Sequence, residues 1–204
     1  MASSTSTNFT TSTPPVPRDC QGSIAPQPIA TPTYGPGGSF TIRSSIKITA
    51  PPDAAFAVLR DHSRWPEWNR FVRKVTIKSD PTATVIEKGT AMTFDVHMDP
   101  TDPDSAPGKV DMLVTILEPY NAEGEGKGWR IAWKPTTYPS WVLRSERVQE
   151  FVDDGHGNTE YTCWETMYGP LAYVVKLTVG TKLEKAFQCW GEDLKKRAEE
   201  NVKK

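Results

Sequence analysis

Disulfide frameworks, metal clusters and membrane spans all need residues that this chain of 204 residues largely lacks. Its three cysteines, Cys20, Cys163 and Cys189, are widely spaced and form no CxxC pair, so neither a disulfide framework nor a zinc site is indicated. No apolar run approaches the roughly 18 residues of a membrane span. The N-terminus also lacks the charged and apolar regions of a secretory signal. We therefore expect a reduced, cytoplasmic protein without membrane insertion.

An excess of charge of either sign is also missing. The 24 Lys and Arg residues balance 25 Asp and Glu residues, so nothing in the charge favours nucleic acid as a partner. There is no GxSxG elbow, P-loop or dinucleotide fingerprint. Asp99, Asp102 and Asp104 lack the Gly and Glu of a calcium loop, and neither His62 nor His156 has a metal partner by spacing. The sequence therefore predicts neither a metal nor a cofactor.

Residues 1–38 differ in composition from the rest of the chain, because about half of them are Ser, Thr or Pro. A segment with so few apolar side chains cannot offset its ordering entropy, so we expect a disordered tail whose deletion up to residue 36 leaves stability unchanged. The segment is poor in acidic residues, as organellar transit peptides are, although Arg18 is its only basic residue. Organellar targeting therefore stays open as an alternative.

The pattern becomes that of a folded domain in residues 39–204. Apolar residues at Phe40, Ile42, Ile46 and Ile48 alternate with polar ones and predict a half-buried strand. Helical spacing follows after Pro52. A second, short helix then carries Trp65 and Trp68, which are three residues apart and can therefore turn to one side. We favour a core position for both tryptophans, and one of them lining a ligand cavity is the alternative.

The chain then reads as further strands joined by turns, and ends in one long helix. Two of the strands, "WVLRSERVQEFVDD" and "NTEYTCWETMY", flank a "DGHG" hairpin turn. Seven strands are predicted in all, with the later ones in meander order. Apolar residues from near Leu171 to near Val202 recur every three to four positions, which predicts a helix of about 48 Å. Such a helix can lie across a whole antiparallel sheet.

Two motifs in this pattern resemble a known family. The stretch "APPDAAFAVLRDHSRWPEWN" resembles the opening of START-like (SRPBCC) proteins of the polyketide cyclase/dehydrase type, and "GNTEYTCWETMYGPLAYVV" resembles their second signature. The resemblance covers about residues 40–202. It implies an α+β helix-grip fold, as in Bet v 1-like proteins. A curved seven-stranded antiparallel sheet would carry two short helices after the first strand and grip the long C-terminal helix. Between sheet and helix it implies a cavity for a lipophilic small molecule.

Two departures from the family pattern concern charged residues. The family often has Pro where this chain has Arg70, and His where it has Arg147.

The fold alone does not define an activity, because it hosts carriers, receptors, cyclases, hydrolases and chaperone activators. An activator of that kind would need a large exposed apolar patch, and no run in the sequence suggests one.

The register of the last hairpin follows from its turn. Centring the turn on His156 pairs Arg147 with Glu165 and Gln149 with Cys163. Since side chains alternate between faces, we expect one face, the more apolar and therefore concave one, to carry Trp141, Leu143, Ser145, Arg147, Gln149, Phe151, Tyr161, Cys163, Glu165 and Met167.

An ion pair between Arg147 and Glu165 would then lie inside an otherwise apolar face, where an unpaired charge would be costly. A structural pair, a group that orients a ligand and an acid–base catalyst are the three interpretations of this pair. The sequence leaves them open.

Two functions fit the pattern. The first is binding of a lipophilic small molecule such as a polyketide, a lipid or an isoprenoid-like compound. The alternative is a polyketide cyclase or dehydratase of secondary metabolism, in which Arg147 stabilises an enolate and Glu165 or Tyr173 moves a proton. Binding is favoured because the sequence places no clear catalytic His or Cys near the cavity, and His97 is expected on the solvent side. The predicted ligand-binding residues are Met92, Phe94, Met98, Met112, Trp129, Trp133, Arg147, Glu165, Tyr173 and Phe187.

Overall fold

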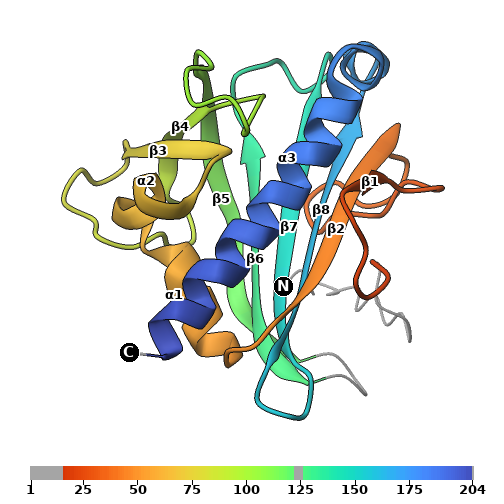
Figure 1. Cartoon of the computed structure of the whole chain (residues 1–204). Coiled ribbons are helices and arrows are strands. Elements are labelled where there is room, and N and C mark those ends of the chain that lie inside the picture. Colours follow the sequence, from red (N-terminus) through yellow and green to blue (C-terminus); the bar gives the residue numbers. More distant parts are fainter. Residues whose placement is uncertain (1–15, 122–125, 204) are drawn as a thin grey trace, which may run out of the picture.

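The computed structural model describes residues 16–121 and 126–203, and this part of the chain has an α+β architecture (Figure 1). Its eight strands form one antiparallel sheet in the order β1-β2-β8-β7-β6-β5-β4-β3. The sheet curves around the long helix α3, so the predicted helix-grip fold is confirmed. In chain order the elements are β1 (Ser23–Ile24), β2 (Phe40–Ile48), α1 (Pro52–Arg60), the 3-10 helix η1 (His62–Arg64), α2 (Trp65–Trp68), β3 (Val72–Ile77), β4 (Ala91–Val96), β5 (Gly108–Asn121), β6 (Lys127–Pro135), β7 (Arg144–Asp153), β8 (Thr159–Tyr168) and α3 (Leu171–Val202).

The predicted register of the β7–β8 hairpin is confirmed. Arg147 lies opposite Glu165 and Gln149 lies opposite Cys163. Gly155 and Gly157 in the turn both have positive φ, a conformation that costs glycine little. Because side chains alternate along each strand, this register directs both pairs towards α3.

Helix α3 is held on the concave face mainly by Trp190, which is fully buried. The centroid of its ring lies 5.2 Å from that of Trp65, 6.2 Å from that of Trp133 and 6.3 Å from that of Trp68. The indole Nε1–H of Trp190 donates a hydrogen bond of 3.0 Å to Gln149 Oε1. The core interpretation of Trp65 is therefore correct, and Trp68 packs half-buried beside it.

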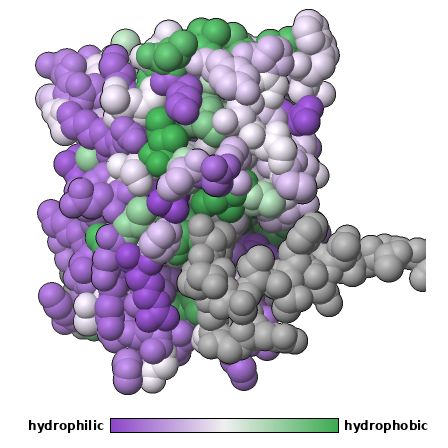
Figure 2. All heavy atoms as spheres, turned by 90° about the vertical axis from the view of Figure 1, so that its right-hand side faces the viewer, coloured by the Kyte–Doolittle hydropathy of each residue, from purple (hydrophilic) through white to green (hydrophobic). Residues whose placement is uncertain are grey.

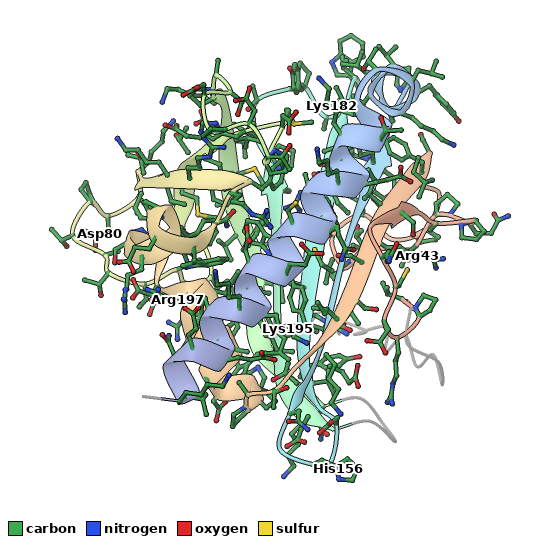
Figure 3. The ribbon with its side chains drawn as sticks, in the orientation of Figure 1. Arg43, Asp80, His156, Lys182, Lys195 and Arg197 are labelled. Atoms are coloured by element: carbon green, nitrogen blue, oxygen red, sulfur yellow. The ribbon has the colours of Figure 1, made fainter. Side chains whose placement is uncertain are left out.

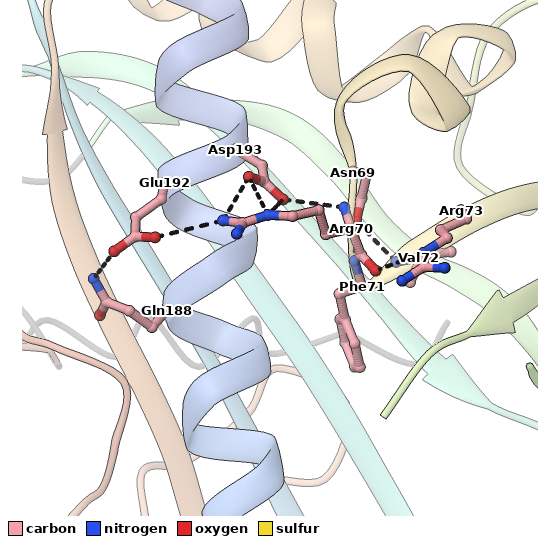
Figure 4. A network of polar contacts seen from close by, with 8 residues as sticks. All are labelled: Asn69, Arg70, Phe71, Val72, Arg73, Gln188, Glu192 and Asp193. Atoms are coloured by element: carbon pink, nitrogen blue, oxygen red, sulfur yellow. Dashed lines mark hydrogen bonds and ion pairs between the residues drawn. The ribbon is translucent and has the colours of Figure 1, made fainter. Parts of the chain in front are cut away.

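Polar contacts attach the segment between α2 and β3 to the same helix (Figure 4). Both Nε and a terminal amino group of Arg70 lie 2.9 Å from Asp193 Oδ1, and the Arg70 backbone N–H donates to Asp193 Oδ2 at 3.0 Å. Asn69 Oδ1 accepts hydrogen bonds from the backbone N–H groups of Phe71 and Val72. The arginine that departs from the family pattern therefore joins two elements that lie far apart in the sequence.

Residues 16–38, which we call the strap, form the main difference from the expected fold. The strap supplies β1, which pairs with β2 and makes eight strands instead of the expected seven. Its Val16 is fully buried on the convex face of the sheet, in an apolar cluster with Ala132, Val148 and Trp164. The expectation of a disordered tail is therefore wrong for residues 16–38, and residues 1–15 lie outside the described residues.

The strap also satisfies polar groups on both sides of the sheet edge. On the convex face, the fully buried carboxylate of Glu146 accepts hydrogen bonds from the Thr33 backbone N–H at 2.8 Å and the Thr33 hydroxyl at 2.5 Å. On the side of α3, Glu184 accepts from the Ile24 backbone N–H and Gln188 accepts from the Gly22 backbone N–H, both at 2.8 Å. The composition of residues 16–38 predicts disorder because it contains no information about these partners, which come from distant elements.

Deleting residues 1–36 should destabilise the protein. It exposes Val148 and Trp164 and removes the Thr33 hydrogen bonds to Glu146. Burying one side chain of this size contributes roughly 1.5–3 kcal/mol, so we expect the free energy of unfolding to fall by about 3 kcal/mol or more. Chemical denaturation measures this change, with Arg18→Ala, an exposed strap substitution, as the control. An unchanged midpoint for the deletion would show that the strap does not hold the convex face.

Trp190→Ala should cost about 3–5 kcal/mol, because it empties the centre of the interface between α3 and the sheet. Tyr173→Ala on the same helix is the matched control, since this tyrosine is exposed and its removal should change stability by about 0.5 kcal/mol or less. Thermal or urea unfolding followed by circular dichroism compares the two. Equal losses of stability in the two variants would mean that Trp190 does not hold α3 against the sheet.

Candidate ligand-binding site

Strands β7 and β8 place an ion pair on the concave face, under α3. Arg147 Nε and one terminal nitrogen lie 3.0 Å and 2.9 Å from Glu165 Oε2. The other carboxylate oxygen, Oε1, accepts a hydrogen bond of 2.7 Å from the Ser145 hydroxyl. The side chain of Arg147 is 7% exposed and that of Glu165 is 13% exposed. The pair is therefore almost fully removed from water, and Glu165 keeps a small exposed edge.

Aromatic rings surround the guanidinium of Arg147. Its Cζ lies 4.2 Å from the ring centroid of Phe187, 5.4 Å from that of Phe71 and 5.6 Å from that of Trp190. A guanidinium close to aromatic faces gains cation–π attraction and loses freedom to rotate. The cation is therefore fixed in position before any ligand arrives.

Two buried hydrogen-bond donors near this cation have no partner within the described residues. The Gln149 side chain is fully buried, and its Oε1 accepts from the Tyr161 hydroxyl at 2.6 Å and from Trp190 Nε1 at 3.0 Å. The Nε2 of Gln149 and the Nε1 of Trp133 are left unpaired. Trp133 lies opposite Arg147 in the β6–β7 register. They are two of seven buried side-chain polar atoms without a partner in the described residues, and what distinguishes them is their place on the strands beside Arg147.

Burial also determines which groups here can react. It raises the pKa of the Cys163 thiol to about 12 and holds the pKa of Tyr161 well above its usual value. The Cys163 thiol therefore stays protonated at neutral pH and is no nucleophile there. Tyr161 likewise stays neutral and serves as a hydrogen-bond donor to Gln149. Arg147 and Glu165 are the charged groups of this region.

Aromatic rings fill the part of the space between α3 and the concave face that lies around Trp190, where we expected an open cavity. Trp65, Phe94, Trp133 and Trp190 pack with ring centroids 5.2–6.3 Å apart. Two surface depressions in the described part of the chain lie elsewhere. One runs beside Ile46 and the last turns of α3, where Lys195 lies (Figure 3). The other lies among short polar and charged side chains of β3, β4 and β5.

Most of the predicted ligand-binding residues lie in or beside the core, and two lie apart from the ion pair. Those buried in the core cluster are Met92, Phe94, Met112, Trp133 and Phe187, and the ion pair Arg147–Glu165 lies beside Phe187. Met98 is only partly buried against this cluster.

Two of the predicted residues lie apart from the ion pair. Trp129 stacks on Phe56 at 5.0 Å, and its Nε1–H donates to Asp53 at 2.6 Å. Tyr173, predicted as a cavity residue, is 59% exposed on the surface of α3. The position follows from the helix period, because Ala172 and Val175 occupy the inner side of the first turns.

Three features go beyond the sequence-based predictions. Gln149, which is expected on the concave face, and Trp190 both belong to the site, and a buried amide on an apolar face is itself a signal for Gln149. His97 was expected in solvent, but it is buried because the loop after β4 folds over it and Ser105 O lies 2.7 Å from its Nδ1. An exposed apolar patch does exist, formed by residues of two separate segments.

Solved structures with the same architecture define the class of protein. They include the hypothetical protein jhp0584 from Helicobacter pylori, with a TM-score of 0.58 and 15% identity over 78% of this chain and 86% of that one. Norcoclaurine synthase from Thalictrum flavum has a TM-score of 0.55 and 12% identity, over 78% and 86%. The di-domain aromatase/cyclase BexL has a TM-score of 0.52 and 14% identity, over 81% and 50%. At this identity the likeness shows a shared helix-grip fold.

The family follows from sequence. A sequence model described as "Polyketide cyclase / dehydrase and lipid transport" matches residues 39–199, and the chain belongs to this family. The predicted resemblance is therefore confirmed. The chain is also similar to the "Oxopyrrolidines biosynthesis cluster protein O" of Penicillium oxalicum, with 31% identity over 170 residues, which cover 76% of this chain and 84% of the relative.

The described residues form neither a metal cluster nor a membrane-spanning helix. No group of three His, Cys, Asp or Glu side chains in this part of the chain is arranged to hold a metal ion. None of its helices is both long and apolar enough to cross a bilayer.

Glu165→Ala should leave the guanidinium of Arg147 buried without its counter-ion. Removing one partner of a buried pair typically costs about 3–5 kcal/mol, and we expect a value near the lower end because Glu165 keeps a small exposed edge. The control is Lys78→Ala, which breaks the exposed pair with Asp111 and should not change stability measurably. Urea denaturation compares them. Equal midpoints would mean that the Arg147–Glu165 pair is solvated.

Proposed function

We propose that this protein binds a polyketide-like small molecule between α3 and the concave face of the sheet. The apolar body of the ligand packs on the aromatic side chains, and its carbonyl or phenolate oxygens accept hydrogen bonds from the site. The observation that carries the proposal is the pair of unpartnered buried donors, Gln149 Nε2 and Trp133 Nε1, near the fixed cation of Arg147.

The chemistry of these groups favours oxygen acceptors. The Arg147 guanidinium and the two unpaired N–H groups are all donors, and a guanidinium fork suits a carboxylate, an enolate or a carbonyl pair. Polyketides carry such oxygens on an otherwise apolar skeleton. A ligand of this kind therefore satisfies in one step the polar groups that the protein leaves unpaired.

Binding requires movement of the aromatic side chains or of α3, since the rings now fill the space. A ligand shifts a protein towards an open state by the difference between its affinities for the two states. Contacts with Arg147, Gln149 and Trp133 exist only when the ligand is inside, so they supply that difference. The first turns of α3 are largely exposed, with Ala172 the one buried residue among residues 171–179, and they provide the route by which the helix opens.

The comparisons support a ligand of this class. The description of the family includes polyketide cyclases, dehydrases and lipid transport, and the similar fungal protein is named after a biosynthesis cluster. These names describe the relatives. For this chain they make a secondary metabolite the first class of ligand to test.

A cyclase or dehydratase activity is the second candidate, favoured by the same family description and by the surroundings of Glu165. Glu165 accepts hydrogen bonds on both oxygens and keeps an exposed edge, so it can exchange a proton with a ligand beside Arg147. Arg147 would stabilise a developing enolate. The exposed Tyr173 takes no part in this version.

Binding is tested with the buried tryptophans as reporters. We expect 1,8-dihydroxyanthraquinone to quench the intrinsic fluorescence of the protein on titration, and Arg147→Met to weaken its binding about tenfold or more, because a hydrogen bond to a charged group contributes roughly 1.5–3 kcal/mol. Lys74→Met, which removes a positive charge from the exposed side of β3, should bind as the unchanged protein does.

Anthracene is the matched ligand, because it has the same ring skeleton without oxygens. Its affinity should be equal for the unchanged protein and for Arg147→Met. Equal loss of both ligands in the variant would mean that Arg147 acts on the fold alone, and no quenching by either ligand would overturn the proposed site.

Native mass spectrometry of the protein from its own source separates carrier from enzyme. A molecule that co-purifies unaltered, and is lost in Arg147→Ala, supports binding. A cyclised or dehydrated molecule, with its open-chain precursor accumulating only in the variant, supports the enzyme.

A further inference from the structure

An exposed apolar patch lies at one end of the molecule, and we call it the apolar end. It comprises the large apolar side chains of the loop before β7 and of the first two turns of α3, namely Tyr138, Trp141, Tyr173, Val174 and Leu177. All are more than half exposed, with Trp141 at 75% and Leu177 at 86%. Single exposed apolar residues are common on protein surfaces, but a group of five in two adjoining segments calls for an explanation.

The two segments are joined directly. The Leu171 backbone N–H donates to the Val142 carbonyl at 3.2 Å. Gly169 has a positive φ of 92°, and a Cβ at this residue would lie 2.7 Å from the same carbonyl oxygen, so glycine permits the close approach. Figure 2 shows apolar side chains along the upper edge of the molecule, the end at which α3 begins in Figure 1.

Helix α3 turns away from the sheet at this end. Its first turns are seen nearly end-on in Figure 1, whereas the remainder runs obliquely across the sheet. The Thr178 hydroxyl donates to the Val174 carbonyl at 2.8 Å, and Gly180 follows two residues later. Threonine hydroxyls bonded back to the preceding turn and helical glycines both favour bending. The bend makes Val174 and Leu177 project from the surface.

Within the two segments that carry the apolar end, the charges have one sign. Residues 134–144 and 169–183 contain Lys134, Arg144, Lys176 and Lys182, and they contain no Asp or Glu, although the whole chain carries a formal net charge of -1. Lys176 is exposed on the first turns of α3, and Lys182 is exposed one turn beyond the bend (Figure 3). Within these two segments, protruding Trp, Tyr and Leu side chains are therefore combined with basic residues alone, and an acidic loop contacts α3 further along the helix, where Asp99 pairs with Lys185.

We propose that the apolar end docks reversibly on an anionic membrane surface. Trp and Tyr favour the headgroup level of a bilayer, Leu and Val enter the acyl boundary, and nearby lysines are attracted to anionic lipids. A second copy of this chain is a poor occupant, because a two-fold contact would set the basic residues of one copy against those of the other. The side chains are exposed and project outward, which suits a deformable lipid surface. Docking does not depend on which ligand the protein binds.

Flotation of the full chain with vesicles tests the proposal. We expect binding to vesicles of phosphatidylcholine with phosphatidylserine and little binding to phosphatidylcholine alone. Trp141→Ser combined with Leu177→Ser should abolish binding. Lys176→Gln and Lys182→Gln should each weaken it about fivefold, because each basic residue contributes a comparable share of the attraction to an anionic surface. These side chains are exposed, so the variants should melt as the unchanged protein does.

The matched control lies at the opposite end of α3. Val202→Ser combined with Lys196→Gln removes an exposed apolar and an exposed basic side chain from the same helix, and should bind vesicles as the unchanged protein does. Binding that is absent from both kinds of vesicle, or unaffected by the Trp141 and Leu177 substitutions, would overturn the proposal. A dimer seen by light scattering and dissolved by the same two substitutions would also overturn it, because the patch would then be an interface between copies.

Discussion

The packing of the Trp190 indole ring between α3 and the concave face of the sheet is the interaction on which the rest of the structure depends. Trp190 lies on α3 where this helix meets α2 and the central strands. It contacts the rings of Trp65 and Trp68 from α2 and of Trp133 from β6, and its indole N–H donates to Gln149. A sheet curved this strongly needs a large side chain at the centre of its concave face. Since α3 crosses the sheet once, the position of this ring determines which other side chains of the helix face the strands.

The interior around Trp190 accepts polar groups at a known energetic cost. The Arg147–Glu165 pair and the Gln149 amide are buried among aromatic rings, where apolar side chains of similar volume would stabilise the fold as well or better. The hydrogen-bonding capacity of this region is satisfied only in part, because Gln149 Nε2 and the neighbouring Trp133 Nε1 have no acceptor. A polar group retained against stability is best explained by a ligand, and the proposed site rests on that argument.

The strap changes the character of the central strands. Almost every residue of β7 is buried, because α3 covers the concave face and residues 16–38 cover part of the convex face. Glu146 is thus buried on the side that a two-layer fold would leave in water. The first turns of α3 and the loop before β7, by contrast, stay largely exposed. That region contains the apolar end and adjoins the proposed route into the site.

The sequence by itself determined the local structure of this protein. Apolar periods of two and of three to four identify the strands and the long helix, and the turn at His156 determines that Arg147 faces Glu165, because both depend on neighbours in the chain. Three features were decided only by the tertiary structure: the burial of Val16, the filling of the expected cavity by Trp65, Trp133 and Trp190, and the apolar end. Each depends on whether side chains from distant segments meet. That outcome is set by three-dimensional packing volume and by the supply of hydrogen-bond partners, which composition and periodicity do not contain.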